Sequence, residues 1–95
     1  MTKILIIVMT LIFSDAAYST CTAPEPPTIP NPETTVTAEM VKAQNDVKAF
    51  LSAAESFLKC TKNSTRHNKM VDKMKDVGDS FNKTVKAYKT RMANA

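Results

Sequence analysis

Glycine, tryptophan and cysteine are scarce in this sequence: its 95 residues include 1 Gly, no Trp and 2 Cys, and aromatic residues make up 6%. Phosphate-binding loops, dinucleotide-binding folds and turn-rich β-sandwiches need several glycines, because glycine tolerates positive φ angles. A single glycine argues against all three classes. Helices have no such requirement, so the composition favours an all-α protein.

The length and the charge narrow the classes further. A chain of 95 residues has room for one small domain. Its 13 Lys and Arg against 9 Asp and Glu give a formal charge of +4. Such a charge favours solubility and weak attraction to anionic surfaces, but it identifies no partner.

The N-terminus has the three parts of a secretory signal peptide. Lys3 supplies a positive charge, an apolar run covers Ile4 to Phe13, and short residues follow, with Ala17 and Ser19 placed for cleavage after Ser19. The apolar run is too short to cross a bilayer, which needs about 20 residues. Residues 1–19 are therefore predicted to be a cleaved signal peptide, and the protein to be secreted or periplasmic.

A bacterial lipoprotein is the alternative, with Cys21 as the lipidated first residue of the mature chain. Lipidation signals have an aliphatic residue three positions before the cysteine and a very small one directly before it. Tyr18, Ser19 and Thr20 fit that pattern poorly. Export without a lipid anchor is the preferred interpretation.

The two cysteines have one possible intramolecular pairing, Cys21 with Cys60. Export makes a disulfide the default state of such a pair. Closing a loop of about 40 residues should stabilise the fold by about 4 kcal/mol on the chain-entropy model. Catalytic redox pairs are usually spaced C-x-x-C, so a structural disulfide is predicted.

Residues 20–36 are predicted to form an extended arm. All five prolines of the chain lie here, at positions 24, 26, 27, 30 and 32. Proline fixes φ and removes a backbone donor, which favours polyproline geometry. The arm is long enough to run back along the first helix and cover Phe50 and Phe57 with Ile29 and the prolines. Binding to a proline-recognition domain is the alternative function for this segment.

The rest of the chain, residues 37–95, is predicted to be an antiparallel two-helix hairpin with helices over about 38–62 and 66–92. Thr37 is the expected N-cap of the first helix. Its apolar line is expected at Met40, Gln44, Val47, Leu51, Ala54 and Leu58, flanked by Phe50 and Phe57. The second line is expected at His67, Met70, Met74, Val77, Phe81, Thr84 and Tyr88, widened by Val71, Gly78, Val85 and Met92. Asn63, Ser64 and Thr65 supply the turn, so Phe57 should lie near Met70, Phe50 near Val77, and Met40 near Tyr88.

Three residues of the second helix form a candidate Cu(I) site. His67, Met70 and Met74 share one helical face, and imidazole and thioether are ligands that suit Cu(I). Methionine is also an ordinary filler of helical cores, and that interpretation is preferred. No cofactor is therefore expected.

Catalysis is not expected either. His67 is the single histidine, both cysteines are assigned to the disulfide, and Asp72, Asp76 and Asp79 are expected on the solvent face of the helix. These residues assemble no catalytic triad, carboxylate pair or tetrahedral metal set.

The second helix is basic. The preferred interpretation is a solvent-exposed face with ion pairs such as Asp79 with Lys83. The alternative is binding to an anionic membrane surface. Nucleic acid is not an expected partner, because no exposed aromatic row is available for base stacking. The basic residues are Arg66, Lys69, Lys73, Lys75, Lys83, Lys86, Lys89 and Arg91.

Several short motifs resemble a group of small exported bacterial proteins that carry a signal peptide, a Cys- and Pro-containing arm and two helices. The motifs are Cys21 with Pro24 and Pro27, Val47 to Phe50, Cys60, His67 with Asn68, Phe81 with Asn82, and Tyr88 with Lys89. The resemblance implies an address in the bacterial envelope and no activity. We therefore expect a non-enzymatic exported binding or structural protein that binds a protein partner or itself, and not a small-molecule substrate. The alternative is a cationic effector on anionic membranes.

Overall fold

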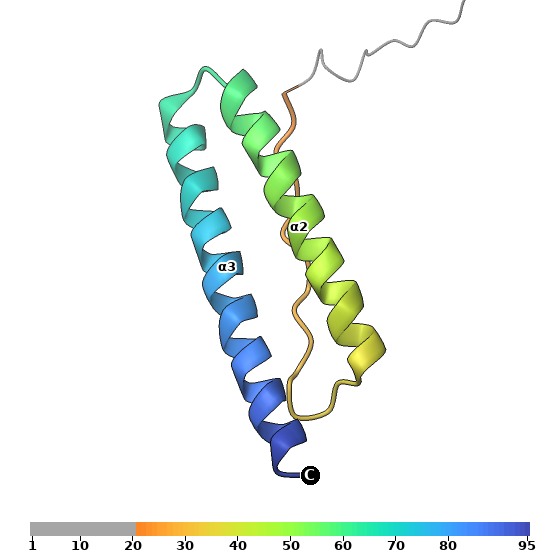
Figure 1. Cartoon of the computed structure of the whole chain (residues 1–95). Coiled ribbons are helices and arrows are strands. Elements are labelled where there is room, and N and C mark those ends of the chain that lie inside the picture. The colour runs from red at the N-terminus through yellow and green to blue at the C-terminus, as the bar shows by residue number, and fades with distance from the viewer. Residues whose placement is uncertain (1–20) are drawn as a thin grey trace, which may run out of the picture.

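The computed structural model of the chain describes residues 21–95, and within them it contains two helices and no strand (Figure 1). Helix α2 spans Thr37–Cys60 and helix α3 spans Ser64–Ala93. They lie antiparallel, and an extended arm of residues 21–36 precedes them. The predicted all-α hairpin with a disulfide between Cys21 and Cys60 is confirmed. The predicted signal peptide lies outside the described residues.

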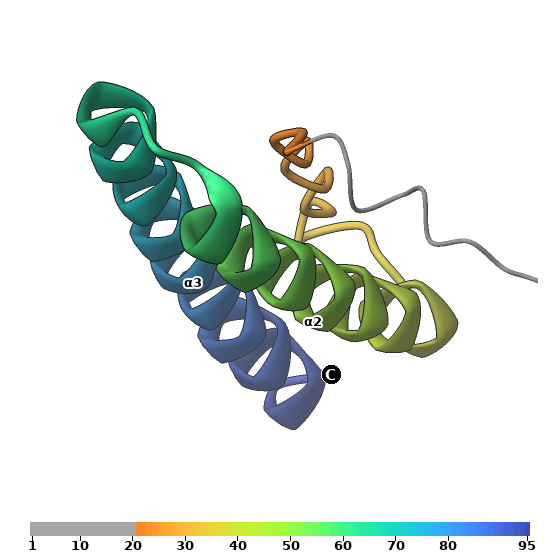
Figure 2. The same ribbon diagram turned by 90° about the horizontal axis from the view of Figure 1, so that it is seen from above.

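The arm packs along one side of the helix pair. It starts beside the end of α2, runs the length of the hairpin and turns near the C-terminus of α3 (Figure 1). Viewed from above, it lies on one side of the hairpin and leaves the other side uncovered (Figure 2). Ala23 and Ile29 pack against the core cluster that contains Phe50 and Phe57. This agrees with the predicted covering of the two phenylalanines.

A turn at the end of the arm leads into α2. The Asn31 side chain accepts a 2.8 Å hydrogen bond from the Glu33 amide, and its carbonyl accepts one of 3.0 Å from the Thr35 amide. These bonds reverse the chain in the way that Asn does in Asx turns.

The N-cap of α2 differs from the prediction. Thr37 is the first helical residue, and Val36 takes the cap position with no side-chain hydrogen bond. The hydroxyl of buried Thr35 instead donates a 2.7 Å hydrogen bond to Glu39 Oε1 in the first turn. The packing of the arm decides where the helix starts, and residue propensity at Thr37 does not.

The buried line of α2 also lies to one side of the predicted one. Gln44 is exposed and Leu51 and Leu58 are half-buried, whereas Phe50 and Phe57 lie at the centre of the core. The cause is the arm, because it covers the phenylalanine side of the helix. The buried residues repeat at spacings of three and four: Met40, Ala43, Val47, Phe50, Ala54 and Phe57.

Helix α3 begins after a capped turn. The Asn63 side chain accepts a 2.8 Å hydrogen bond from the Arg66 amide, which satisfies one donor of the first turn. The helix therefore starts at Ser64, two residues before the predicted start, and α2 ends at Cys60 because Thr61 is extended. The buried residues of α3 are Met70, Val77 and Thr84.

The pairing of the helices agrees with the predicted register. Thr37 and Tyr88 are hydrogen-bonded through their hydroxyl groups at one end of the hairpin. At the other end the Arg66 guanidinium lies 5.5 Å from the centre of the Phe57 ring. Phe57 and Met70 line one hollow, and Met40 and Tyr88 line another.

Candidate functional site

The arm is fastened at its N-terminal end by the disulfide. The Cα atoms of Cys21 and Cys60 are 5.7 Å apart. Cys21 is half-buried, its sulfur 3.5 Å from the Phe57 carbonyl oxygen, and Cys60 is exposed. The bond therefore lies beside Phe57 near the end of α2 and remains open to solvent on the Cys60 side.

The other end of the arm is held by Arg91 of α3. Its guanidinium donates hydrogen bonds of 2.8 Å to the Pro32 carbonyl and 2.7 Å to the Thr35 carbonyl. It also lies 5.4 Å from the centre of the Tyr88 ring. A planar guanidinium can serve two carbonyls at once, and a lysine ammonium serves such a site less well. From the sequence Arg91 was only one of eight basic residues; its seven-residue spacing from Thr84 was the available signal that it faces inward.

The three residues of the candidate Cu(I) site differ in burial. Met70 is 2% exposed and belongs to the core cluster, and Met74 packs against that cluster. His67 is half-buried. In residues 21–95 no group of three or more His, Cys, Asp or Glu side chains is placed to hold a metal ion. Met70 has a packing role, and Cu(I) binding by these three residues stays the less favoured alternative.

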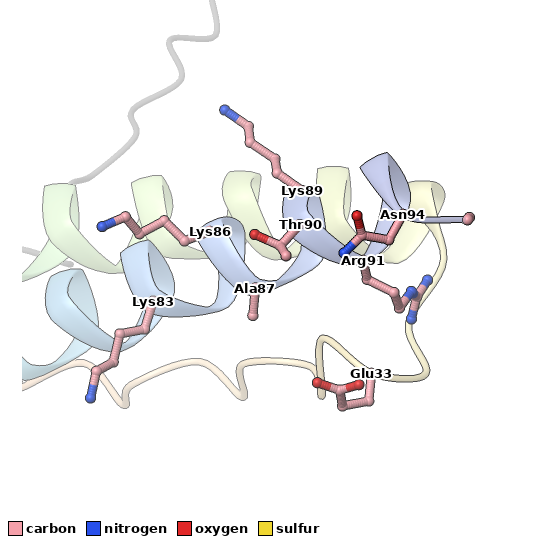
Figure 3. Close-up of a pocket in the computed structure, with 9 residues that line it drawn as sticks. Glu33, Lys83, Lys86, Ala87, Lys89, Thr90, Arg91 and Asn94 are labelled. Carbon is pink, nitrogen blue, oxygen red and sulfur yellow. The ribbon is translucent and has the colours of Figure 1, made fainter.

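The basic residues near the end of α3 surround a shallow hollow. Lys83, Lys86 and Lys89 line it, together with Arg91 and with Glu33 from the arm. The three lysine side chains point in different directions, and the Arg91 guanidinium turns toward the arm (Figure 3). The negative end of the α3 dipole lies here as well, because the helix ends at Ala93. The arrangement gives a diffuse positive surface without converging donors.

The side of the hairpin opposite the arm carries mostly apolar side chains, and we call it the open face. Cys60 marks the arm side of α2, and the arm meets α3 at Lys73, Asp76 and Ser80. An α-helix turns by about 100° per residue, so the residues of the open face lie on the side of each buried line that faces away from the arm. They are Val41, Gln44, Leu51 and Leu58 of α2, and Val71, Met74, Gly78, Phe81, Val85 and Met92 of α3.

Exposure and shape distinguish the open face from an ordinary solvated helix surface. Val41 is 51% exposed, Met92 is 47% exposed and Val71 is 42% exposed. A hollow joins the two helices on this side and is lined by Met40, Val41, Gln44, Phe81, Asn82, Val85, Tyr88 and their neighbours. Apolar side chains gathered on one exposed side in this way are typical of an interaction site.

Charged groups border the open face without ionic partners. Within residues 21–95 the one ion pair joins Lys42 Nζ to Asp46 Oδ2 at 2.8 Å. The expected pair of Asp79 with Lys83 does not form. Glu55 and Lys75 at the edges of the open face are likewise free of ion pairs in the described chain. They are available to an external partner.

Neither helix in residues 21–95 combines the length and hydropathy needed to cross a bilayer. No protein-family model, curated protein or solved structure matches the chain. The resemblance to small exported bacterial proteins therefore stays a prediction from the residues quoted for it.

Proposed function

We propose that the protein is exported and acts, without catalysis, as a binding or structural component of the cell envelope or secretome. Its working surface is the open face. The observation that carries this proposal is the asymmetry of the hairpin, because the arm occupies one face and no segment of residues 21–95 covers the apolar residues of the other (Figure 2).

Export is supported by two independent features. The first is the apolar run Ile4 to Phe13 with short residues after it. The second is the disulfide between Cys21 and Cys60, a bond that persists in oxidising compartments. Mass spectrometry of the mature N-terminus tests this part. We expect a chain that begins at Thr20, and a diacylglyceryl mass on Cys21 would contradict it.

Protein binding is favoured over membrane binding by the mixed charge on the polar side of α3. A membrane-surface helix has a strongly basic polar face opposite its apolar face. On α3 the exposed lysines alternate with the exposed carboxylates of Asp72, Asp76 and Asp79, which lowers the attraction to anionic lipids.

Photo-crosslinking in intact cells tests the open face. We place a benzophenone side chain at Leu51, on the open face, or at Ala49, an exposed position elsewhere on α2. Protein adducts should form from position 51 and not from 49. Equal adducts from both positions, or none, would contradict the proposal. Salt-sensitive sedimentation of the oxidised protein with anionic vesicles would support the cationic effector instead.

A further inference from the structure

We infer that the occupant of the open face is a second copy of this chain, so that two hairpins form an antiparallel four-helix bundle. This inference rests on the proposed function and names the partner of the same surface. In the bundle, α2 of one copy lies on α3 of the other, and the two-fold axis runs parallel to the helices.

The size of the open face fits such a dimer. Helix α2 has 24 residues, and a helix rises 1.5 Å per residue and is about 10 Å wide, so two adjacent helices offer a face of about 700 Å². A standard protein interface buries about 800 Å² on each partner. Full overlap of both helices is needed to approach that area, and the arrangement of α2 on the partner's α3 provides it.

Charge complementarity favours the same arrangement. The Thr37–Tyr88 hydrogen bond sets the level of the two helices. The helices are antiparallel, and Glu55 is as many residues after Thr37 as Met70 is before Tyr88, so Glu55 and Met70 lie at the same height along the helix axes. The two-fold axis is parallel to the helices, so the residues of the second copy keep the same heights. Lys75 of the second copy lies about 7 Å further along α3, within reach of the Glu55 carboxylate. Lys48 is level with Val77 and lies about 3 Å along the axis from both Lys75 and Asp79 of the second copy. The charge complementarity therefore rests on the Glu55–Lys75 pair.

Gly78 is the third observation. It lies in the middle of α3 on the open face, and no described residue has a positive φ, so the backbone does not require glycine there. A Cβ added at this position meets nothing within 4 Å in the single chain. Glycine in a helix interior is destabilising relative to alanine, and it allows another helix to approach closely. By the same count Gly78 is level with Val47, so Lys48 and Gln44 of the second copy lie within about one helical turn of this gap and Leu51 lies slightly further along.

Sedimentation equilibrium of the oxidised mature protein tests the inference. We expect a dimer that dissociates on dilution. The substitution Leu51→Glu should raise its dissociation constant about a hundredfold or more, because it buries an unpaired carboxylate at both symmetric sites. The matched control Ala49→Glu, which adds the same charge outside the open face, should leave the constant unchanged.

A charge swap provides a second test that does not depend on the apolar core. Glu55→Lys should weaken the dimer about tenfold, since symmetry turns two attractive pairs into two repulsive ones. Adding Lys75→Glu should restore it. Circular dichroism of each variant in dilute solution reports whether the hairpin itself is intact.

The outcomes separate this inference from the proposed function. A monomer at millimolar concentration, or a dimer indifferent to Leu51→Glu and to the charge swap, overturns the inference. If the monomer still gives adducts with another protein from position 51 and not from 49, the proposed function stands and the second copy is the wrong partner. If the monomer gives no such adducts, both are wrong.

Discussion

Arg91, in the last turn of α3, donates a 2.8 Å hydrogen bond to the main-chain oxygen of Pro32, 59 residues earlier in the chain. The disulfide at Cys21 holds the opposite end of the same arm. The arm is therefore fixed at both ends, covalently beside the turn and by charged hydrogen bonds beside the end of α3. It completes one side of a core that two helices alone would leave half uncovered.

Replacing Arg91 by Met should lower the free energy of unfolding by about 2 kcal/mol, because two hydrogen bonds from a charged donor are lost. Urea denaturation in dilute solution measures the change. Lys83→Met is the matched control and should have an effect below about 0.5 kcal/mol, since surface substitutions of this kind are near neutral. Equal effects of the two substitutions would show that Arg91 does not hold the arm.

Removing the disulfide with Cys21→Ser and Cys60→Ser together should cost about 4 kcal/mol on the chain-entropy model. The sequence separation of 39 residues sets this value. Denaturation midpoints with and without dithiothreitol measure it. The wild type should lose stability in reductant, and the double variant should not respond to it. A wild type that is indifferent to reductant would contradict the structure.

The position of the buried line on α2 can be tested with one residue type. Val47 is 6% exposed and Val41 is 51% exposed. Val47→Ala should destabilise the monomer by about 2 kcal/mol through lost burial and a residual cavity. Val41→Ala should be neutral or slightly stabilising in dilute solution, because alanine is the better helix former. Similar losses at both sites would place the buried line elsewhere.

Gly78→Ala should have opposite effects on the folding of the hairpin and on its dimerisation. In dilute solution it should stabilise the hairpin by about 1 kcal/mol, since the helix gains a better former and the added methyl group meets nothing within 4 Å. In the dimer the same methyl group should obstruct the close approach of the second copy, so the dissociation constant should rise. Thermal unfolding at low concentration and sedimentation at high concentration measure the two effects.

The sequence predicts the architecture well, because each feature that defines it either lies within one short segment or has a single possible interpretation. Two cysteines allow one pairing, all the prolines gather in one segment, and apolar residues at spacings of three and four define two helices. The turn at Asn63 is equally local, and the structure confirms its cap.

The features that the sequence does not predict depend on contacts between distant segments. Thr35 rather than Thr37 supports the start of α2, because the arm buries Thr35. Phe50 and Phe57 lie at the centre of the core, because the arm covers their side of the helix. The role of Arg91 depends on two carbonyls more than 50 residues away. Helical periodicity alone contains none of this information.

The four methionines of residues 21–95 allow the most direct test that the working surface is the face opposite the arm. Met40 and Met70 are buried in the hairpin, whereas Met74 and Met92 belong to the open face. Methyl NMR of the oxidised mature protein with a soluble paramagnetic probe reports the exposure of each. We predict strong relaxation of Met74 and Met92 in dilute solution that declines as the protein concentration rises, with Met40 and Met70 protected throughout. Relaxation of Met74 and Met92 that stays constant at every concentration and in the presence of envelope extract, or relaxation of Met70 as strong as that of Met92, would contradict the account.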